Sequence, residues 1–196
     1  MTIGNGSRLL WGEHEALDAS TGQEVYLLPG QTWVGRGAYR IRTLLGSCVA
    51  VTLWHPGQRV GGMCHYLLAG RQNRPAARNP RYAEDAMQVL IEAFSHYGCP
   101  VQELVARLFG GGHMFAPTQG RAGSDEQAVP LRNVEVGQRL VREYGMQMQP
   151  GHLGGSGHRQ VVFDVQTGAV WLRHTPLKKR EATALGGPLL PCPQCA

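Results

Sequence analysis

Two apolar runs joined by a short turn constrain the fold of this chain more than any other feature. The first run is Val49 to Trp54 and the second is Arg59 to Leu68. The intervening His55-Pro56-Gly57-Gln58 carries a Pro-Gly turn signal, so we expect the two runs to pair as a β-hairpin. The adjacent Gly61 and Gly62 predict a bulge or a close approach of another backbone within the second strand.

The remaining apolar patterns predict an α+β domain. Helical spacing predicts a helix over residues 82–97 that stops at Gly98, and Asn133 is a good N-cap for a second helix that ends at Gly145. Further strands are expected at 104–109 and 146–148, and residues 161–165 and 169–173 are expected to form a second hairpin. Residues 25–30 are a short apolar run closed by a Pro-Gly turn, and residues 39–45 lead into the cysteine turn. The predicted fold class is therefore α+β and α/β sandwich-like, with a mixed sheet built from hairpins and flanked by two amphipathic helices.

Length and local composition predict one domain with two appendages. A chain of 196 residues can bury a core without disulfides or metals. Residues 1–24 are polar and Gly-rich and are interpreted as a variable N-terminal lead-in. Residues 25–174 form the domain, and residues 175–196 are expected to be a flexible basic tail. No run reaches the ~20 apolar residues of a membrane span and the N-terminus lacks a signal-peptide core, so we expect a cytoplasmic protein.

Charge and cysteine content narrow the function classes. The net charge is +5, but the basic residues are scattered except at Lys178-Lys179-Arg180, which supports nucleic-acid binding poorly. The five cysteines are an odd number and are expected to be thiols in a cytoplasmic protein.

Cys48 and His65 form the candidate chemical pair of the hairpin. A loop of four residues, His55 to Gln58, places Trp54 opposite Arg59 and Cys48 directly opposite His65, with Cβ atoms ~4.5–5.5 Å apart. A loop one residue longer would put the two side chains on opposite faces unless the glycine pair supplies a bulge. An imidazole can generate the reactive thiolate, and backbone N–H groups of the Gly46-Ser47-Cys48 turn could hold an oxyanion.

A structural role competes with this chemistry. Cysteine is among the most buried residue types, so a cysteine entering an apolar strand is usually part of the core, and Cys64 fits that interpretation well. Cys48, Cys64 and His65 could also ligate a metal, but the adjacent Cys64 and His65 point to opposite faces of a strand.

Two other motifs are weaker candidates for functional sites. Cys192-x-x-Cys195 has zinc-ligand spacing, but no second Cys/His pair accompanies it, so a solvated tail is favoured over a zinc site. Gly110-Gly111-Gly112 is not followed by the residues of a phosphate-binding loop, and a close backbone approach beside the active site is favoured. No metal or organic cofactor is predicted.

The chain resembles the CheD family of bacterial chemoreceptor glutamine deamidases from about Leu27 to Arg173. Six segments in the same order carry the resemblance: Leu-Leu-Gly-Ser-Cys-Val-Ala-Val (44–51), Gly-Gly-Met-Cys-His (61–65), Arg-Tyr-Ala-Glu-Asp-Ala-Met (81–87), Gly-Gly-Gly-His-Met-Phe (110–115), Arg-Asn-Val-Glu-Val (132–136) and Val-Val-Phe-Asp-Val-Gln-Thr-Gly-Ala-Val-Trp (161–171). The resemblance implies a fold like the deamidase domain of the cytotoxic necrotising factor toxins.

The resemblance also implies roles for the site residues. Cys48 would be the nucleophile and His65 the base, and family members often carry a third active-site group, a threonine six residues before the cysteine. Arg42 occupies that position here and Thr43 follows it, so either Thr43 takes the role after a small shift or the third group comes from elsewhere.

The resemblance further implies substrates and partners. The substrates would be glutamine side chains on the cytoplasmic helices of methyl-accepting chemotaxis proteins. CheD-like proteins can also hydrolyse receptor glutamate methyl esters, and some bind a CheC-type phosphatase. The competing hypothesis is a non-catalytic adaptor that binds receptors or such a phosphatase.

Overall fold

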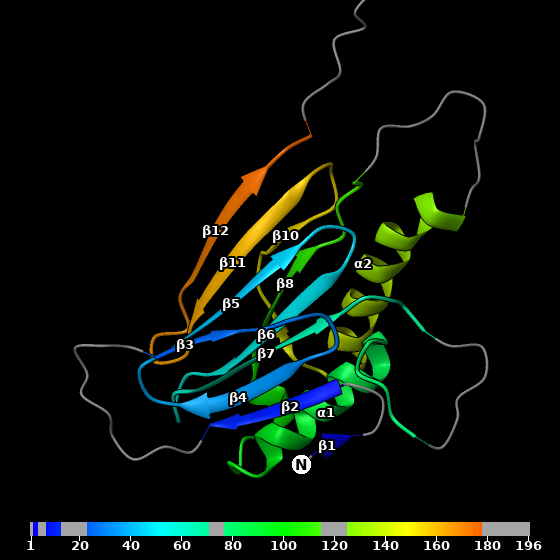
Figure 1. Cartoon of the computed structure of the whole chain (residues 1–196). Coiled ribbons are helices and arrows are strands. Elements are labelled where there is room, and N and C mark those ends of the chain that lie inside the picture. The colour runs from blue at the N-terminus through cyan, green and yellow to red at the C-terminus, as the bar shows by residue number, and fades with distance from the viewer. Residues whose placement is uncertain (1, 4–6, 13–22, 71–76, 115–124, 178–196) are drawn as a thin grey trace, which may run out of the picture.

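The protein folds into three layers (Figure 1). The computed structural model describes residues 2–3, 7–12, 23–70, 77–114 and 125–177. Within these segments two sheets face one another, and both α-helices pack on the outer face of the larger sheet. The α+β class is confirmed, but the predicted mixed sheet is two sheets, and the helices flank only one of them.

The larger sheet is built around the predicted hairpin. Its strands, in spatial order, are β1 (Thr2–Ile3), β2 (Ser7–Gly12), β4 (Thr32–Arg36), β7 (Val60–Tyr66), β6 (Val49–His55), β8 (Val105–Gly110) and β10 (His152–Leu153), with β9 (Gln147–Met148) paired to β8. β6 and β7 are central and buried on both faces, which explains why their sequences are almost continuously apolar.

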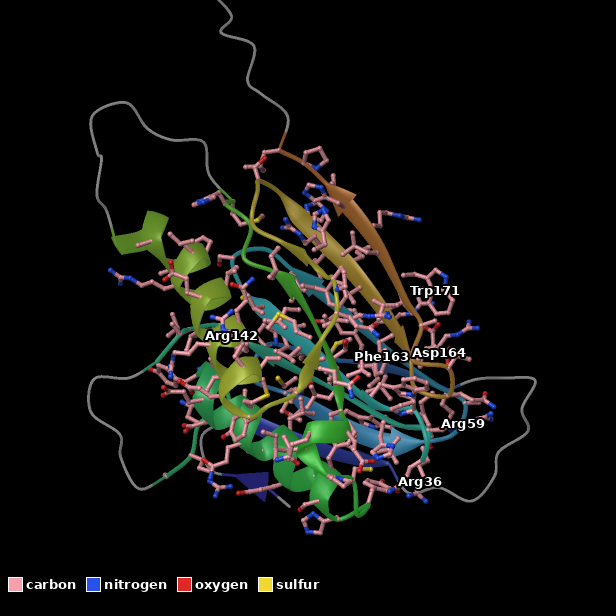
Figure 2. All side chains as sticks on the ribbon, turned by 180° about the vertical axis from the view of Figure 1, so that it is seen from behind. Arg36, Arg59, Arg142, Phe163, Asp164 and Trp171 are labelled. Carbon is pink, nitrogen blue, oxygen red and sulfur yellow. The ribbon has the colours of Figure 1, made fainter. Side chains whose placement is uncertain are left out.

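The smaller sheet holds the second predicted hairpin. Its order is β12 (Val170–Thr175), β11 (His158–Asp164), β5 (Tyr39–Leu45) and β3 (Gln23–Tyr26). Buried and exposed residues alternate strictly along β5 because one face of this sheet packs inward. Phe163 is buried between the sheets, whereas Trp171 lies on the outer side and is half exposed (Figure 2).

Helices α1 (Ala83–Ser95) and α2 (Asp125–Glu143) cover the other face of the larger sheet, and a short 3-10 helix, η1 (Val101–Glu103), leads into β8. The helix predicted over 82–97 is confirmed. The predicted start of the second helix is wrong, because α2 begins at Asp125 and Asn133 lies inside it. Figure 2 shows Arg142 near the end of α2, across the molecule from Trp171. No helix in the described part of the chain is long and apolar enough to cross a membrane.

The register of the β6–β7 hairpin differs from the predicted one by two residues. Trp54 pairs with Gly61 rather than Arg59, and His65 pairs with Ala50 rather than Cys48. The loop is shifted by one residue because His55 continues the strand, where its Nδ1 accepts a hydrogen bond from the Gln58 N–H at 3.2 Å. A shift of two residues leaves every side chain on its predicted face.

The two glycines of β7 allow close packing without a bulge. Both Gly61 and Gly62 keep regular pairing with β6. A Cβ atom on Gly61 would lie 2.9 Å from the ring of Phe163, and one on Gly62 would lie 2.8 Å from the Trp33 carbonyl oxygen. Of the two predicted alternatives, a bulge and a close approach, the structure therefore shows the close approach.

Candidate active site

The turn at Gly46-Ser47-Cys48 carries the chain from the smaller sheet to the larger one. β5 ends at Leu45 in the first sheet, and β6 begins at Val49 in the second. The turn lies at the same end of the sheets as the N-terminal half of α2 (Figure 1). The inward side chains of β5 therefore face those of the β6–β7 hairpin close to Cys48.

Thr43 and His65 meet between the two sheets. Thr43 is an inward residue of β5, and its Oγ1 lies 2.8 Å from Nδ1 of His65. The same hydroxyl donates to the carbonyl oxygen of Leu27 at 2.8 Å. Thr43 and His65 are 2% and 1% exposed, so both hydrogen bonds are shielded from water.

Arg42 is excluded from this contact by the alternation of the strand. Its side chain points to the outer face of the smaller sheet, is 44% exposed and forms an ion pair with Glu24 on β3. The structure thus brings Thr43, and not the residue six positions before Cys48, to the histidine.

Cys48 lies on the His65 side of the hairpin. It packs against the core between the sheets, as does Ala50, the residue paired with His65. Cys48 precedes Ala50 by two residues, so it is the diagonal neighbour of His65, a relation in which residues are ~7–8 Å apart and their Cβ atoms are somewhat closer. Cys48 is partly exposed, whereas the other described cysteines, Cys64 and Cys99, are buried.

Burial keeps both groups of the pair neutral. Desolvation raises the pKa of the Cys48 thiol, and hydrogen bonding from the Ser47 side chain and from the Cys48 N–H offsets part of that rise. Desolvation lowers the pKa of His65 to about 4, against a smaller opposing effect of backbone hydrogen bonding at Leu27. At neutral pH the favoured state is a thiol beside an uncharged imidazole rather than an ion pair.

The second ring nitrogen of His65, Nε2, is not used in the contact with Thr43. His65 Nε2 is buried and has no hydrogen-bond partner in the described part of the chain, so it is not bonded to Cys48 here. Catalytic hydrogen bonds are often loose in the absence of substrate and tighten in the complex. The arrangement therefore offers a buried, uncharged imidazole on the same face of the hairpin as a partly exposed thiol.

The three carbonyl groups of the turn all accept hydrogen bonds. Gly112 N donates to Gly46 O and Gly111 N donates to Cys48 O, each at 2.8 Å. The Asn133 amide donates to Ser47 O at 3.0 Å. Gly110 has a φ of +115°, and a Cβ atom there would lie 2.1 Å from Cys48 O. The close approach predicted for the triple glycine is confirmed.

The sequence indicates the residues that support the turn only in part. The sequence indicates Asn133 only as a helix cap, because its buried contact with the turn depends on tertiary packing. Arg159 was missed: it is fully buried beside Gly112 and donates to His152 Nδ1 at 2.8 Å and to two backbone carbonyls. No local sequence pattern distinguishes such an arginine from a solvated one.

The competing ligand sets find no support among the described residues. Cys64 belongs to the core between the larger sheet and the helices, on the opposite face from His65. No group of three His, Cys, Asp or Glu side chains suited to a metal ion occurs in the described segments. Cys192 and Cys195 lie outside the described residues.

Comparison with known proteins identifies the family. A sequence model described as CheD, chemotactic sensory transduction, matches residues 67–174. A "Probable chemoreceptor glutamine deamidase CheD 1" of Chromobacterium violaceum is 43% identical over 155 residues, 79% of each chain. A similarly named protein of Pseudomonas savastanoi pv. phaseolicola is 41% identical over 161 residues, 82% of this chain and 90% of its own. The chain belongs to the CheD family.

The similarity to these relatives extends over the candidate site. The family model begins after His65, but a matched segment of 155 residues in a chain of 196 must include residues 43–65. Among solved structures, a Neisseria meningitidis protein, NMB0706, matches with a TM-score of 0.37 and 10% identity over 64% of this chain and 53% of its own. That value is too low to support an argument about the fold, and the likeness to the toxin deamidase domain stays a prediction.

Proposed function

We propose that this protein deamidates glutamine side chains of chemoreceptors, with Cys48 as nucleophile, His65 as general base and Thr43 as the group that orients the base. The observation that carries the proposal is the buried Thr43–His65 hydrogen bond. It supplies an oriented imidazole beside the only partly exposed cysteine of the described segments. The names of the 43% and 41% identical relatives support the substrate class.

The Thr43 contact selects the tautomer of His65. The threonine hydroxyl hydrogen is given to Leu27 O, so Thr43 Oγ1 is free only to accept from the imidazole. Nδ1 must then carry the proton, and Nε2 keeps its lone pair. This is the form of histidine that can remove a proton from a thiol, and it matches the unpartnered state of Nε2.

The first half of the reaction forms a thioester. His65 Nε2 takes the proton of Cys48 Sγ as the sulfur attacks the carboxamide carbon of the glutamine. The resulting oxyanion is held by backbone N–H groups of the turn. The imidazolium then protonates the nitrogen, the C–N bond breaks and ammonia leaves.

The second half releases glutamate. Nε2 accepts a proton from water as the water oxygen attacks the thioester carbon, and collapse of the intermediate breaks the C–S bond. The imidazolium returns its proton to the sulfur, so the enzyme is regenerated. The same steps hydrolyse a glutamate methyl ester with methanol as the leaving group, which accounts for a methylesterase side activity.

The chemistry requires no metal or organic cofactor, because the nucleophile, the base and the oxyanion donors all come from the chain. Conversion of a neutral amide to a carboxylate adds a negative charge to a receptor helix and changes its neighbouring charge pairs. Since the proposed substrates are the cytoplasmic helices of receptors, we place the protein in the cytoplasm.

The direct test is mass spectrometry of a receptor cytoplasmic fragment incubated with and without the protein. We expect at least one glutamine to gain the mass difference between an amide and an acid, and Cys48→Ala to abolish the change. Conversion that persists with Cys48→Ala, or no conversion by the wild-type protein, would refute the proposal.

An adaptor function is the second candidate, and the outer face of the smaller sheet favours it. Tyr26, Leu44 and Trp171 expose about half of their side chains there, with no helix in the described segments covering them. A CheC-type phosphatase or a receptor could bind this face without any chemistry. The adaptor alone predicts that Cys48→Ala retains full function in chemotaxis, whereas deamidation predicts its loss.

A further inference from the structure

We propose that Asn133 is a positioning residue that fixes the nucleophile turn and the strand of the base relative to one another. Its single side-chain amide bridges the two parts of the candidate site. Nδ2 donates to Ser47 O at 3.0 Å, immediately before Cys48, and to Leu67 O at 2.7 Å, two residues after His65. The inference rests on the proposed function, because it assigns Asn133 to the same Cys48–His65 site.

The orientation of the Asn133 amide follows from its partners. Both neighbours are carbonyl oxygens, which only the NH₂ end of the amide can satisfy. The side chain is fully buried, and its Oδ1 has no hydrogen-bond partner in the described part of the chain. Both N–H donors of the amide are thus committed, one to the turn and one to the residue that follows β7, and the amide oxygen is left without a partner in the described part of the chain.

The bond to Ser47 O also orients a possible oxyanion donor. The Ser47–Cys48 peptide is planar and trans, so its C=O and N–H point in opposite directions. The Asn133 amide holds the carbonyl on the α2 side, which turns the Cys48 N–H away from the helix. That N–H belongs to the nucleophile residue itself, so its direction decides whether it can reach an oxyanion formed by attack of the Cys48 sulfur.

The helix that carries Asn133 is itself fixed to the strand of the base. The Tyr66 hydroxyl donates to the Asn133 carbonyl oxygen at 2.7 Å, and Tyr66 follows His65 directly. A Cβ atom on Gly137 would lie 2.3 Å from the Tyr66 oxygen, so the glycine makes room for this contact. The side chain and the backbone of one residue thus join α2, β7 and the turn.

Simple packing does not account for an asparagine at this position. Asparagine is a weak helix former, and a buried amide oxygen without a partner is unfavourable. Leucine has nearly the same shape and would bury apolar surface in the adjoining core. The hydrogen bonds to Ser47 O and Leu67 O explain why an amide occupies this position.

Asn133→Leu is the test, with two readouts. The first is the pH dependence of Cys48 alkylation, followed at the Cys48 peptide, which needs no receptor. We expect the midpoint of that profile to move to higher pH, because Asn133 no longer holds Ser47 in place, and the hydrogen bond of the Ser47 side chain lowers the pKa of the Cys48 thiol. The second is the kinetics of receptor deamidation, where we expect kcat to fall at least about 10-fold with KM changed less than about 2-fold, because displaced oxyanion donors act mainly in the transition state.

Val141→Ala is the matched control. Val141 lies on the same helix, eight residues further along, and is fully buried in the same core, but it contacts neither the turn nor β7 through a polar group. It should lower stability without shifting the alkylation profile or kcat. Equal effects of Asn133→Leu and Val141→Ala, at matched fractions of folded protein, would overturn the inference.

A second variant covers the case in which Asn133→Leu does not fold. Asn133→Ser adds no apolar bulk but is too short to reach both carbonyls, and it should show the same upward shift and the same loss of kcat. An unchanged profile and unchanged kcat in a folded Asn133→Ser protein would refute the bridging role. If the wild-type protein fails to deamidate while the alkylation profile shifts as expected, the proposed function fails and the role of Asn133 stands.

Discussion

The Thr43 hydroxyl of one sheet lies 2.8 Å from His65 Nδ1 of the other, and it gives its own hydrogen to the Leu27 carbonyl oxygen. This short chain of two hydrogen bonds fixes which nitrogen of the imidazole carries the proton. It also joins the His65 imidazole of the larger sheet to the smaller sheet. The contact is therefore the point at which fold and proposed chemistry depend on each other.

Thr43→Val removes the hydroxyl and keeps the shape of the side chain. We expect the deamidation rate to fall on the order of 10-fold to 100-fold. That loss is part of the ~10²–10⁴-fold rate enhancement that a positioned general base supplies. We also expect about 1–3 kcal/mol of lost stability, because Leu27 O is left without its donor. Thr43→Ser keeps the hydroxyl and should retain most of the activity. A Thr43→Ser protein as impaired as Thr43→Val would contradict an orienting role for the hydroxyl.

Arg42→Ala provides the contrasting change one residue away. The Arg42 side chain is half exposed and its ion pair with Glu24 lies on the outer face. Exposed pairs contribute ~0–1 kcal/mol, so we expect stability to change by no more than that and deamidation of a short receptor peptide to be unchanged. Urea unfolding and peptide kinetics provide the measurements. A large loss of peptide deamidation would show that Arg42, and not Thr43, serves the site.

This pair also shows what the sequence could and could not predict. The family pattern places a threonine six residues before Cys48, and Arg42 occupies that position here. Alternation along the strand, rather than this spacing, decides which neighbour faces inward. The pattern of β5, buried at Tyr39, Ile41, Thr43 and Leu45, is visible in the sequence only once the strand is known to be half buried. Period-2 alternation therefore decides whether Arg42 or Thr43 faces His65, which motif spacing alone does not.

Two other differences arise from tertiary contacts. The predicted hairpin loop starts one residue too early, whereas in the structure His55 remains in the strand and its ring accepts the Gln58 N–H. The predicted start of the second helix is eight residues too late, because it rests on asparagine being a favoured N-cap, yet α2 begins at Asp125 and continues through Pro130. The buried Asn133 amide donates to two distant carbonyls, which local sequence patterns do not reveal.

The reactivity of Cys48 can be measured against an internal reference. Near neutral pH we expect iodoacetamide to modify Cys48 faster than Cys99, because Cys48 is partly exposed and Cys99 is 4% exposed. Burial raises the pKa of the Cys48 thiol, so its rate should keep rising as pH increases above 8, without an acidic plateau. His65→Ala should slow the reaction at neutral pH. Equal rates for the two cysteines would favour the adaptor function.

Gly111→Ala tests the cradle around the turn. Gly111 has a φ of +64°, and a Cβ atom would lie 2.3 Å from Val134 Cγ2. We expect a loss of about 1–3 kcal/mol from overpacking, in addition to roughly 1–2 kcal/mol from the left-handed backbone. The double variant with Val134→Ala should recover the packing part only.

Gly98→Ala is the control for the backbone part of that cost. Gly98 has a φ of +67° and nothing within 4 Å of its would-be Cβ, so its substitution carries the conformational cost alone. Suppose that Gly111→Ala and Gly98→Ala destabilise the protein equally and that Val134→Ala gives no recovery. The close packing of α2 against the triple glycine would then not be the cause of the lost stability.

The buried imidazole should make folding stability depend on pH in a defined window. His65 has a pKa of about 4 in the folded protein and an ordinary value of 6.5 when unfolded. Between these values the unfolded chain binds more protons, so the stability that His65 contributes is complete above pH ~6.5 and falls as pH decreases towards ~4. The difference corresponds to a loss of about 3 kcal/mol at most. Urea unfolding at several pH values, compared with His65→Gln, isolates it from the titration of other groups.

The proposed role of His65 as general base also predicts the acid limb of catalysis. The proposed reaction needs uncharged His65, so kcat/KM for the folded enzyme should decline with a midpoint nearer pH 4 than pH 6.5, provided that circular dichroism confirms the fold at each pH. Thr43→Val leaves the ring buried but removes the acceptor that fixes its tautomer. It should lower the plateau of the profile without moving the midpoint to the ordinary histidine value. A wild-type midpoint near 6.5 would mean that the base acts from a solvated position, which would contradict the buried Thr43–His65 arrangement as the working state of the enzyme.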